Sequence, residues 1–124
     1  MNLPAPLPWG PISRTDLVRY AGASGDFNPL HHDPDYAKAQ GFPDVMAHGM
    51  YTAGLLATSL CRWFGQQRVS AFSVRFMAPV FPADQLLARC LALTPAEDGM
   101  IDAVLSMERD GTPVLSGRAK LLKE

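Results

Sequence analysis

The sequence predicts an α+β protein in which an antiparallel β-sheet wraps around one long central helix. Two observations predict this class. Residues 49–64 are apolar around almost the whole circumference of a helix, and the segments with strand-like alternation all follow them. A chain of 124 residues has room for one domain, so we expect a single domain over residues 1–124.

A short helix is predicted at residues 14–23. Ser13 and Asp16 form a capping pattern at its start, because their side chains can bind backbone amides that have no partner inside the helix. Glycines follow its last residues and end it. Its predicted apolar face consists of Leu17, Val18 and Ala21.

A loop and a second short helix come next. Residues 26–33 are too rich in turn-forming residues for a regular helix or strand. Asp33 is the predicted cap of the second helix and Pro34 its first residue, a position that suits proline. Gly41 and Pro43 stop this helix after a short run.

The segment 49–64 is the strongest structural signal. Its polar residues lie along one narrow stripe that contains Thr52, Ser59 and Arg62. A helix that is apolar nearly all round must be covered by other elements, because water would otherwise contact its apolar side chains. Gly65 ends the helix.

Strands are predicted after the helix, at residues 72–77, 86–93, 101–108 and 114–122. Asp110 and Gly111 form the hairpin turn between the last two. The strand at 86–93 is apolar on both faces and interrupted only by Arg89, so its outer face also needs cover. A homodimer or heterodimer through the sheet would supply that cover.

Composition excludes several kinds of partner. Eleven Lys and Arg against twelve Asp and Glu give a net charge of -1, which argues against nucleic-acid binding. No apolar run approaches the roughly 18 residues of a membrane span, and the proline-rich opening does not have the pattern of a secretion signal. Cys61 and Cys90 have no CxxC partner and are expected to be reduced, buried thiols. We therefore expect a cytoplasmic protein.

Asp26 and His31 are the candidate acid–base pair. Five residues along a helix correspond to a rotation of about 140°, which would separate them. Asn28 and Pro29 prevent a helix there, and a turn can bring the two side chains to one point. A carboxylate and an imidazole that share one water can move protons near neutral pH. The alternative is that Asp26 is a cap and His31 binds backbone.

The residues from Gly25 to Asp33 (GDFNPLHHD), with Ala37 after them and Ala47–Met50 (AHGM) further on, resemble the MaoC-like hydratases. This family is the hydratase-2, or (R)-specific enoyl-CoA hydratase, branch of the hot-dog superfamily. The resemblance covers roughly residues 20–60. It implies a hot-dog fold, dimers with the thioester arm near the interface, and reversible syn addition of water to a trans-2-enoyl thioester.

The resemblance also assigns roles to single residues. Asp26 and His31 match the catalytic pair that holds the water, and Asn28 matches an asparagine that organises the loop. Gly49 matches the glycine whose amide faces the thioester oxygen, which suits a helix start, where amides lack partners and the dipole favours negative charge. His48 either shapes this loop or has a structural role. No cofactor is implied, since the substrate carries its own CoA or acyl-carrier pantetheine arm.

Several alternatives stay open. The same site would serve a 3-hydroxyacyl dehydratase acting on acyl-carrier-protein substrates, and the same fold would serve a non-catalytic hot-dog partner subunit in a heteromeric hydratase. A hot-dog thioesterase is disfavoured because residues 48–65 contain no Asp or Glu. We expect no metal site at His31, His32 and Asp33, because adjacent side chains point in different directions and Asp33 caps a helix.

Overall fold

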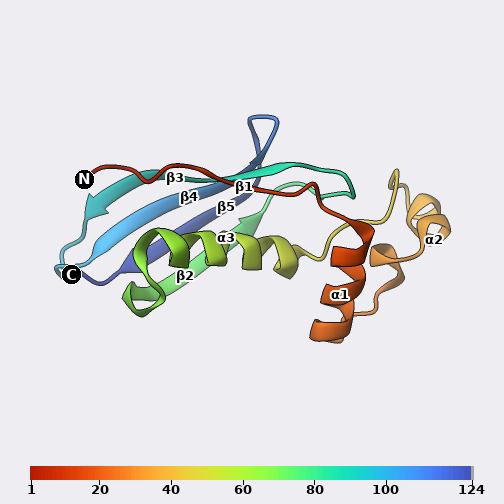
Figure 1. Cartoon of the computed structure of the whole chain (residues 1–124), viewed down its shortest axis with the longest axis horizontal. Coiled ribbons are helices and arrows are strands. Elements are labelled where there is room, and N and C mark those ends of the chain that lie inside the picture. The colour runs from red at the N-terminus through yellow and green to blue at the C-terminus, as the bar shows by residue number, and fades with distance from the viewer. Residues whose placement is uncertain (124) are drawn as a thin grey trace.

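The computed structural model describes residues 1–123 and has a five-stranded antiparallel sheet with helix α3 along one side of it (Figure 1). The strand order is β1-β3-β4-β5-β2. The elements are β1 (Leu7–Trp9), α1 (Arg14–Ser24), the 3-10 turn η1 (Pro29–His31), α2 (Pro34–Ala39), α3 (Gly49–Phe64), the 3-10 turn η2 (Gln66–Arg68), β2 (Val69–Phe76), β3 (Leu86–Pro95), β4 (Ile101–Arg109) and β5 (Thr112–Leu121).

Helix α3 has the predicted bounds and packs one side onto the sheet. Leu56 and Leu60 are fully buried there. Gly117 of β5 allows this close approach, because a Cβ on it would lie 3.0 Å from Leu56 Cδ2. Within this one chain the cover of the helix is incomplete, since Met50, Gly54 and Thr58 form an exposed stripe one turn apart. The sheet is a single layer, and it covers one side of the helix.

Strand β1 was not predicted from the proline-rich opening. It pairs with β3 through Leu7, Pro8 and Trp9. A strand of three residues at the sheet edge tolerates Pro8, which has no amide hydrogen to donate. The Trp9 indole Nε1–H donates to the Ser59 hydroxyl at 2.8 Å, and that hydroxyl donates to the Leu55 carbonyl. The polar stripe of α3 is therefore partly internal, since both Thr52 and Ser59 are buried.

Strand β3 is less apolar on its outer face than the sequence suggested. Leu86, Ala88 and Cys90 are buried on the inner face. On the outer face, Arg89 forms an ion pair with Glu108 of β4 at 3.1 Å, while Leu91 is exposed. Because β1 and β4 flank β3, both of its edges are already paired. Pairing at the edges does not cover the outer face, where Leu91 is 48% exposed, so cover of this face by a partner stays a prediction.

The remaining local predictions are largely confirmed. Ser13 and Asp16 form the capping box of α1, and Asp33 caps α2 with Pro34 in its first turn. The β4–β5 turn is at Asp110 and Gly111. Three details differ: Val18 is exposed, Cys61 is only half-buried, and β2 begins at Val69 rather than at residue 72.

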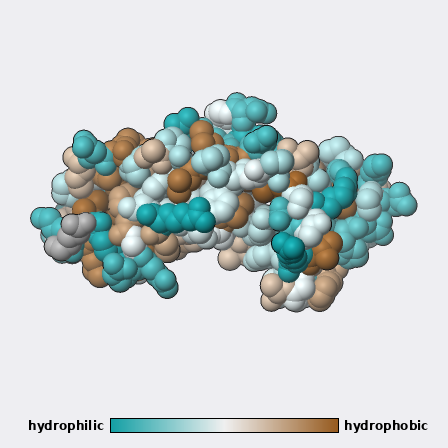
Figure 2. All heavy atoms as spheres, in the orientation of Figure 1, coloured by the Kyte–Doolittle hydropathy of each residue, from teal (hydrophilic) through white to brown (hydrophobic). Residues whose placement is uncertain are grey.

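The surface shown in Figure 2 mixes hydrophobic and hydrophilic residues, and no single apolar patch dominates that face. None of the described helices is long and apolar enough to cross a membrane.

Candidate active site

The loop between α1 and α2 is folded by its own polar side chains. The Asn28 carbonyl oxygen Oδ1 accepts a hydrogen bond from the Leu30 amide and so caps the turn η1. The Asp26 carboxylate accepts one from the Asn28 amide at 3.2 Å. These Asx-type bonds reverse the chain without a regular helix. The predicted role of Asn28 as an organiser of the loop agrees with these contacts.

The turn brings Asp26 and His31 together, as predicted. His31 Nε2 lies 3.8 Å from Asp26 Oδ2. The carboxylate is 52% exposed, whereas the imidazole is 11% exposed. A separation of 3.8 Å is too long for a direct hydrogen bond and suits one water held between the two groups.

Backbone contacts fix the tautomer of His31. Its Nδ1 lies 2.7 Å from the Met46 carbonyl oxygen, which can only accept, so Nδ1 carries the hydrogen. The Met46 amide in turn donates to the Leu30 carbonyl at 3.0 Å. In the neutral ring, Nε2 is therefore a free lone pair on the side of Asp26. The alternative in which His31 only binds backbone is half right, since one ring nitrogen does so and the other does not.

His48 lies behind the pair and is 2% exposed. Its ring stacks on that of His31 with centroids 3.7 Å apart, and the tilted ring of Tyr20 packs against it with centroids 4.9 Å apart. His48 Nε2–H donates to the Asp26 backbone carbonyl at 2.9 Å. Its Nδ1 is buried and has no partner among the described residues.

Tyr51 lies in the first turn of α3, three residues after His48, and its ring contacts that of Tyr20. Burial raises the pKa of the Tyr51 phenol, and the negative charge of Asp16 adds to the effect. The phenol is therefore uncharged at neutral pH.

Gly49 begins α3 at the wall of an apolar cleft of about 340 Å³. His48 makes no side-chain cap, and no described carbonyl or side chain accepts from the Gly49 amide. The Phe76 ring lies beside Gly49, so close that a Cβ there would be 2.9 Å from Phe76 Cε1. Met46 and Ala47 line the same cleft. Since Met46 also binds His31, one segment joins the pair to the cleft wall.

The site donors are close together but poorly arranged for a metal ion. One donor atom each from Asp26, His31 and His48 lies within 4.8 Å of the others. The two imidazole planes are only 21° apart and the ring centroids are 3.7 Å apart, so the lone pairs of the two rings lie in two stacked, nearly parallel planes. Zinc needs ligands that converge at about 2.0–2.1 Å from different directions. His31 Nδ1 and His48 Nε2 bind carbonyl groups, which leaves one nitrogen on each of the two stacked rings.

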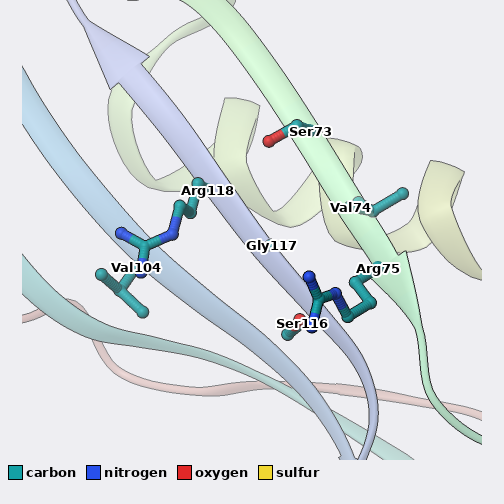
Figure 3. A pocket seen from close by; sticks show the side chains of 7 residues that line it. All are labelled: Ser73, Val74, Arg75, Val104, Ser116, Gly117 and Arg118. Atoms are coloured by element: carbon teal, nitrogen blue, oxygen red, sulfur yellow. The ribbon is translucent and has the colours of Figure 1, made fainter.

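A larger hollow, of about 400 Å³, lies elsewhere on the molecule (Figure 3). Figure 3 shows Arg75 and Arg118 pointing across the strands toward Ser116 and Val104. No histidine or carboxylate lines this hollow. The smaller cleft at Gly49 has none in its lining either, but Met46 lines it and its carbonyl accepts from His31 Nδ1, so it is the cleft that adjoins the Asp26–His31 pair.

Sequence reasoning missed the parts of the site that come from distant segments. Met46 acts through its backbone, which no side-chain pattern reveals, and Phe76 reaches Gly49 from β2. The structure also settles His32 and Asp33. His32 is exposed, with Nε2 near the Phe27 carbonyl at 3.1 Å, and Asp33 is occupied as the cap of α2.

Comparison with known proteins relates the chain to a family and a fold. Residues 4–98 match the family model described as a MaoC like domain. The chain is 37% identical over 120 residues to 3-hydroxyacyl-thioester dehydratase X of Mycobacterium tuberculosis, covering 96% of this chain and 40% of that protein. It therefore spans about two-fifths of the length of that relative.

Two solved structures have the same fold. The ChsH1-ChsH2 complex from Mycobacterium tuberculosis has a chain with a TM-score of 0.86 at 22% identity, covering 99% of this chain and 96% of that one. The (R)-hydratase from A. caviae involved in PHA biosynthesis has a TM-score of 0.81 at 23% identity, covering 100% of this chain and 98% of that one. The expected hot-dog fold is confirmed.

Proposed function

The chain belongs to the MaoC-like domain family, and from this premise we propose that it is a hydro-lyase. The reaction is the reversible syn addition of water to a trans-2-enoyl thioester, which gives an (R)-3-hydroxyacyl thioester. The observation that carries the proposal is the Asp26–His31 pair, separated by 3.8 Å and joined through Met46 to the cleft at Gly49.

The pair supplies the proton chemistry. A water between Asp26 and His31 donates its two hydrogens to the carboxylate and to Nε2, which leaves an oxygen lone pair directed at carbon 3 of the enoyl group. As the carbon–oxygen bond forms, one of the two groups takes a proton from the water, and the pair delivers a proton to carbon 2. Both additions come from one side of the substrate because both groups lie on one side of it, which is why the addition is syn.

Gly49 supplies the electrostatic part. Attack at carbon 3 moves negative charge onto the thioester oxygen, and a free amide at the positive end of α3 stabilises that charge. The apolar cleft binds the carbon chain near the thioester, with Thr52, Phe76 and Leu115 among its lining residues. No group besides the thioester is needed to activate the double bond, so we propose that the protein uses no cofactor.

The thioester handle is the open part of the proposal. The same pair and the same amide serve a CoA thioester or an acyl-carrier-protein thioester, and in the dehydration direction the chemistry is simply reversed. A non-catalytic partner subunit would have no need of a paired Asp26 and His31, and their convergence favours an active chain.

A dimer belongs to the proposal as well. β2 has an unpaired edge among the described residues, is eight residues long and contains no proline, so its backbone groups are free to pair with another chain. Phe76 and Met77 beside the cleft are both 55% exposed, and a partner at this edge would cover them. Either a second copy or a related hot-dog subunit fits this edge.

A cytoplasmic location stays a prediction, with the two free cysteines in its favour.

The test is direct. Purified protein is added to short and long trans-2-enoyl-CoA, and in a second arm to the same acyl groups on a carrier protein. We expect loss of the absorbance of the conjugated thioester and an (R)-3-hydroxy product by chiral analysis. No absorbance loss with any chain length on either handle contradicts the proposed reaction, and an (S) product contradicts its geometry.

A further inference from the structure

We propose that His48 is a positioning residue that holds Asp26 at its working distance from His31. The inference rests on the proposed function and concerns a buried group that the proton transfer itself does not use. His48 reaches both members of the pair: its Nε2–H donates to the Asp26 backbone carbonyl at 2.9 Å, and its ring stacks on His31 at 3.7 Å.

The hydrogen bond from His48 is the tie between Asp26 and the rest of the fold. The other bonds of Asp26 are local: its amide donates to the Ser24 hydroxyl, and its carboxylate accepts from the Asn28 amide. His48 is 22 residues away in the sequence and immediately precedes α3. Without the His48 donor, the exposed segment around Asp26 would be held only by hydrogen bonds to neighbouring residues of the same loop, which move together with Asp26.

The second ring nitrogen supports this assignment. His48 Nδ1 is buried without a partner among the described residues, which is unfavourable because a buried lone pair loses its bond to water. A phenylalanine would fill the same space and stack on His31 without that loss. What a histidine adds at this position is the Nε2–H donor, which suggests that the donor is the functional part of the side chain.

Small displacements of Asp26 matter because the water is held at two points. A misplacement of about 1 Å in a reacting geometry can cost roughly 100-fold in rate. The Gly49 amide, which binds the thioester, lies on α3 and does not depend on the Asp26 loop. Loss of the His48 donor should therefore lower kcat and leave KM nearly unchanged.

The test compares variants that separate the donor from the ring. His48→Phe keeps the stacked ring and removes the donor, and we expect kcat to fall by about 10–100-fold with KM changed by less than about threefold. His48→Gln places an amide N–H near the position of Nε2 and should recover much of the lost kcat. His32→Phe is the matched control, because it removes an exposed imidazole bound locally to the same loop, and it should leave kcat unchanged.

A double-mutant cycle separates positioning from general damage. In an Asp26→Asn background, His48→Phe should cost little further activity, because the group it positions is already disabled. Hydrogen exchange of the segment 25–31 should be faster in His48→Phe than in His48→Gln, a readout that needs no activity. If His48→Phe does not fold, His48→Asn replaces it, since its shorter amide does not reach the Asp26 carbonyl.

Full activity of a folded His48→Phe protein would overturn the inference. So would an equal loss in the wild-type and Asp26→Asn backgrounds, or unchanged exchange of the segment 25–31. A wild-type protein that hydrates no enoyl thioester instead contradicts the proposed function, so the two failures are distinguishable.

Discussion

Replacement of Gly49 by alanine tests how the start of α3 meets the substrate. A Cβ at this position would lie 2.9, 3.2 and 3.3 Å from three carbons of the Phe76 ring. Carbon atoms pack best at about 3.5–4.0 Å, so the nearest contact is about 0.6 Å too short and the ring must move. Because Phe76 is 55% exposed, it can turn toward solvent without disturbing the core.

These numbers predict a small effect on folding and a larger one on turnover. Alanine is favoured over glycine in helices by up to about 1 kcal/mol, which offsets the displacement of the ring, so we expect the free energy of unfolding to change by less than about 1 kcal/mol. The new methyl group narrows the approach to the Gly49 amide. Loss of an oxyanion donor costs about 2.7–4 kcal/mol, and a partial obstruction should cost less, giving a 10–100-fold fall in kcat/KM, or about 1.4–2.7 kcal/mol.

Gly54→Ala is the matched control for this substitution. Gly54 is in the same helix, and a Cβ there would meet no atom within 4 Å, so this variant should keep full turnover. The assay is enoyl-thioester hydration beside a thermal melt for each variant. A double variant, Gly49→Ala with Phe76→Leu, distinguishes two causes of a lower rate. It should restore turnover if the displaced Phe76 ring obstructs the substrate, and it should not if the new methyl group does. A stable and fully active Gly49→Ala protein would refute the reasoning.

The remaining predictions concern stability and assembly. Gly117→Ala should destabilise the fold by about 1–3 kcal/mol in urea unfolding, because its Cβ would press on Leu56 Cδ2 at 3.0 Å; an unchanged midpoint would contradict the close helix–sheet packing. The hydrogen bond from Arg14 holds the pKa of Asp44 below its ordinary value of 3.8, so this pair stabilises the fold above that pH and the benefit is lost as pH falls through the lowered pKa. The stability difference between wild type and Asp44→Asn, below about 1 kcal/mol for so exposed a pair, should therefore vanish in acid, and a difference that grows there would contradict the assignment. The protein should sediment with about twice the 13.5 kDa mass of one chain, or together with a related subunit. Met77→Glu should weaken that assembly, whereas Val18→Glu should not. Equal effects of the two substitutions would contradict β2 as the interface.

Local signals in the sequence were enough for the helices and the catalytic loop. The bounds of α3, the caps at Ser13 and Asp33, and the approach of Asp26 to His31 each depend on residues within a few positions of one another. Turns and caps of this kind are predictable from sequence because the side chains that form them lie in the same short segment.

Features that depend on distant partners could not be predicted in this way. Strand β1 forms because it pairs with the edge of β3 and because the Trp9 indole donates a hydrogen bond to Ser59, which is 50 residues away in the sequence. The apolar character of residues 86–93 suggested a covered outer face, but the pairing of Arg89 with Glu108 depends on the register of β3 against β4. The exposed stripe on α3 follows from the number of layers in the fold, which helical periodicity does not encode.

The central claim is that Asp26 and His31 act as one unit on a shared water. The measurement that tests it most directly is the hydration rate of Asp26→Asn, His31→Ala and the double variant, with Asp35→Asn as the control for loss of an exposed carboxylate nearby. Each single substitution should lower turnover by about 10²–10⁴-fold, the double variant should be little worse than either, and the control should be unaffected. An Asp26→Asn protein that folds and keeps near-wild-type turnover would contradict the account.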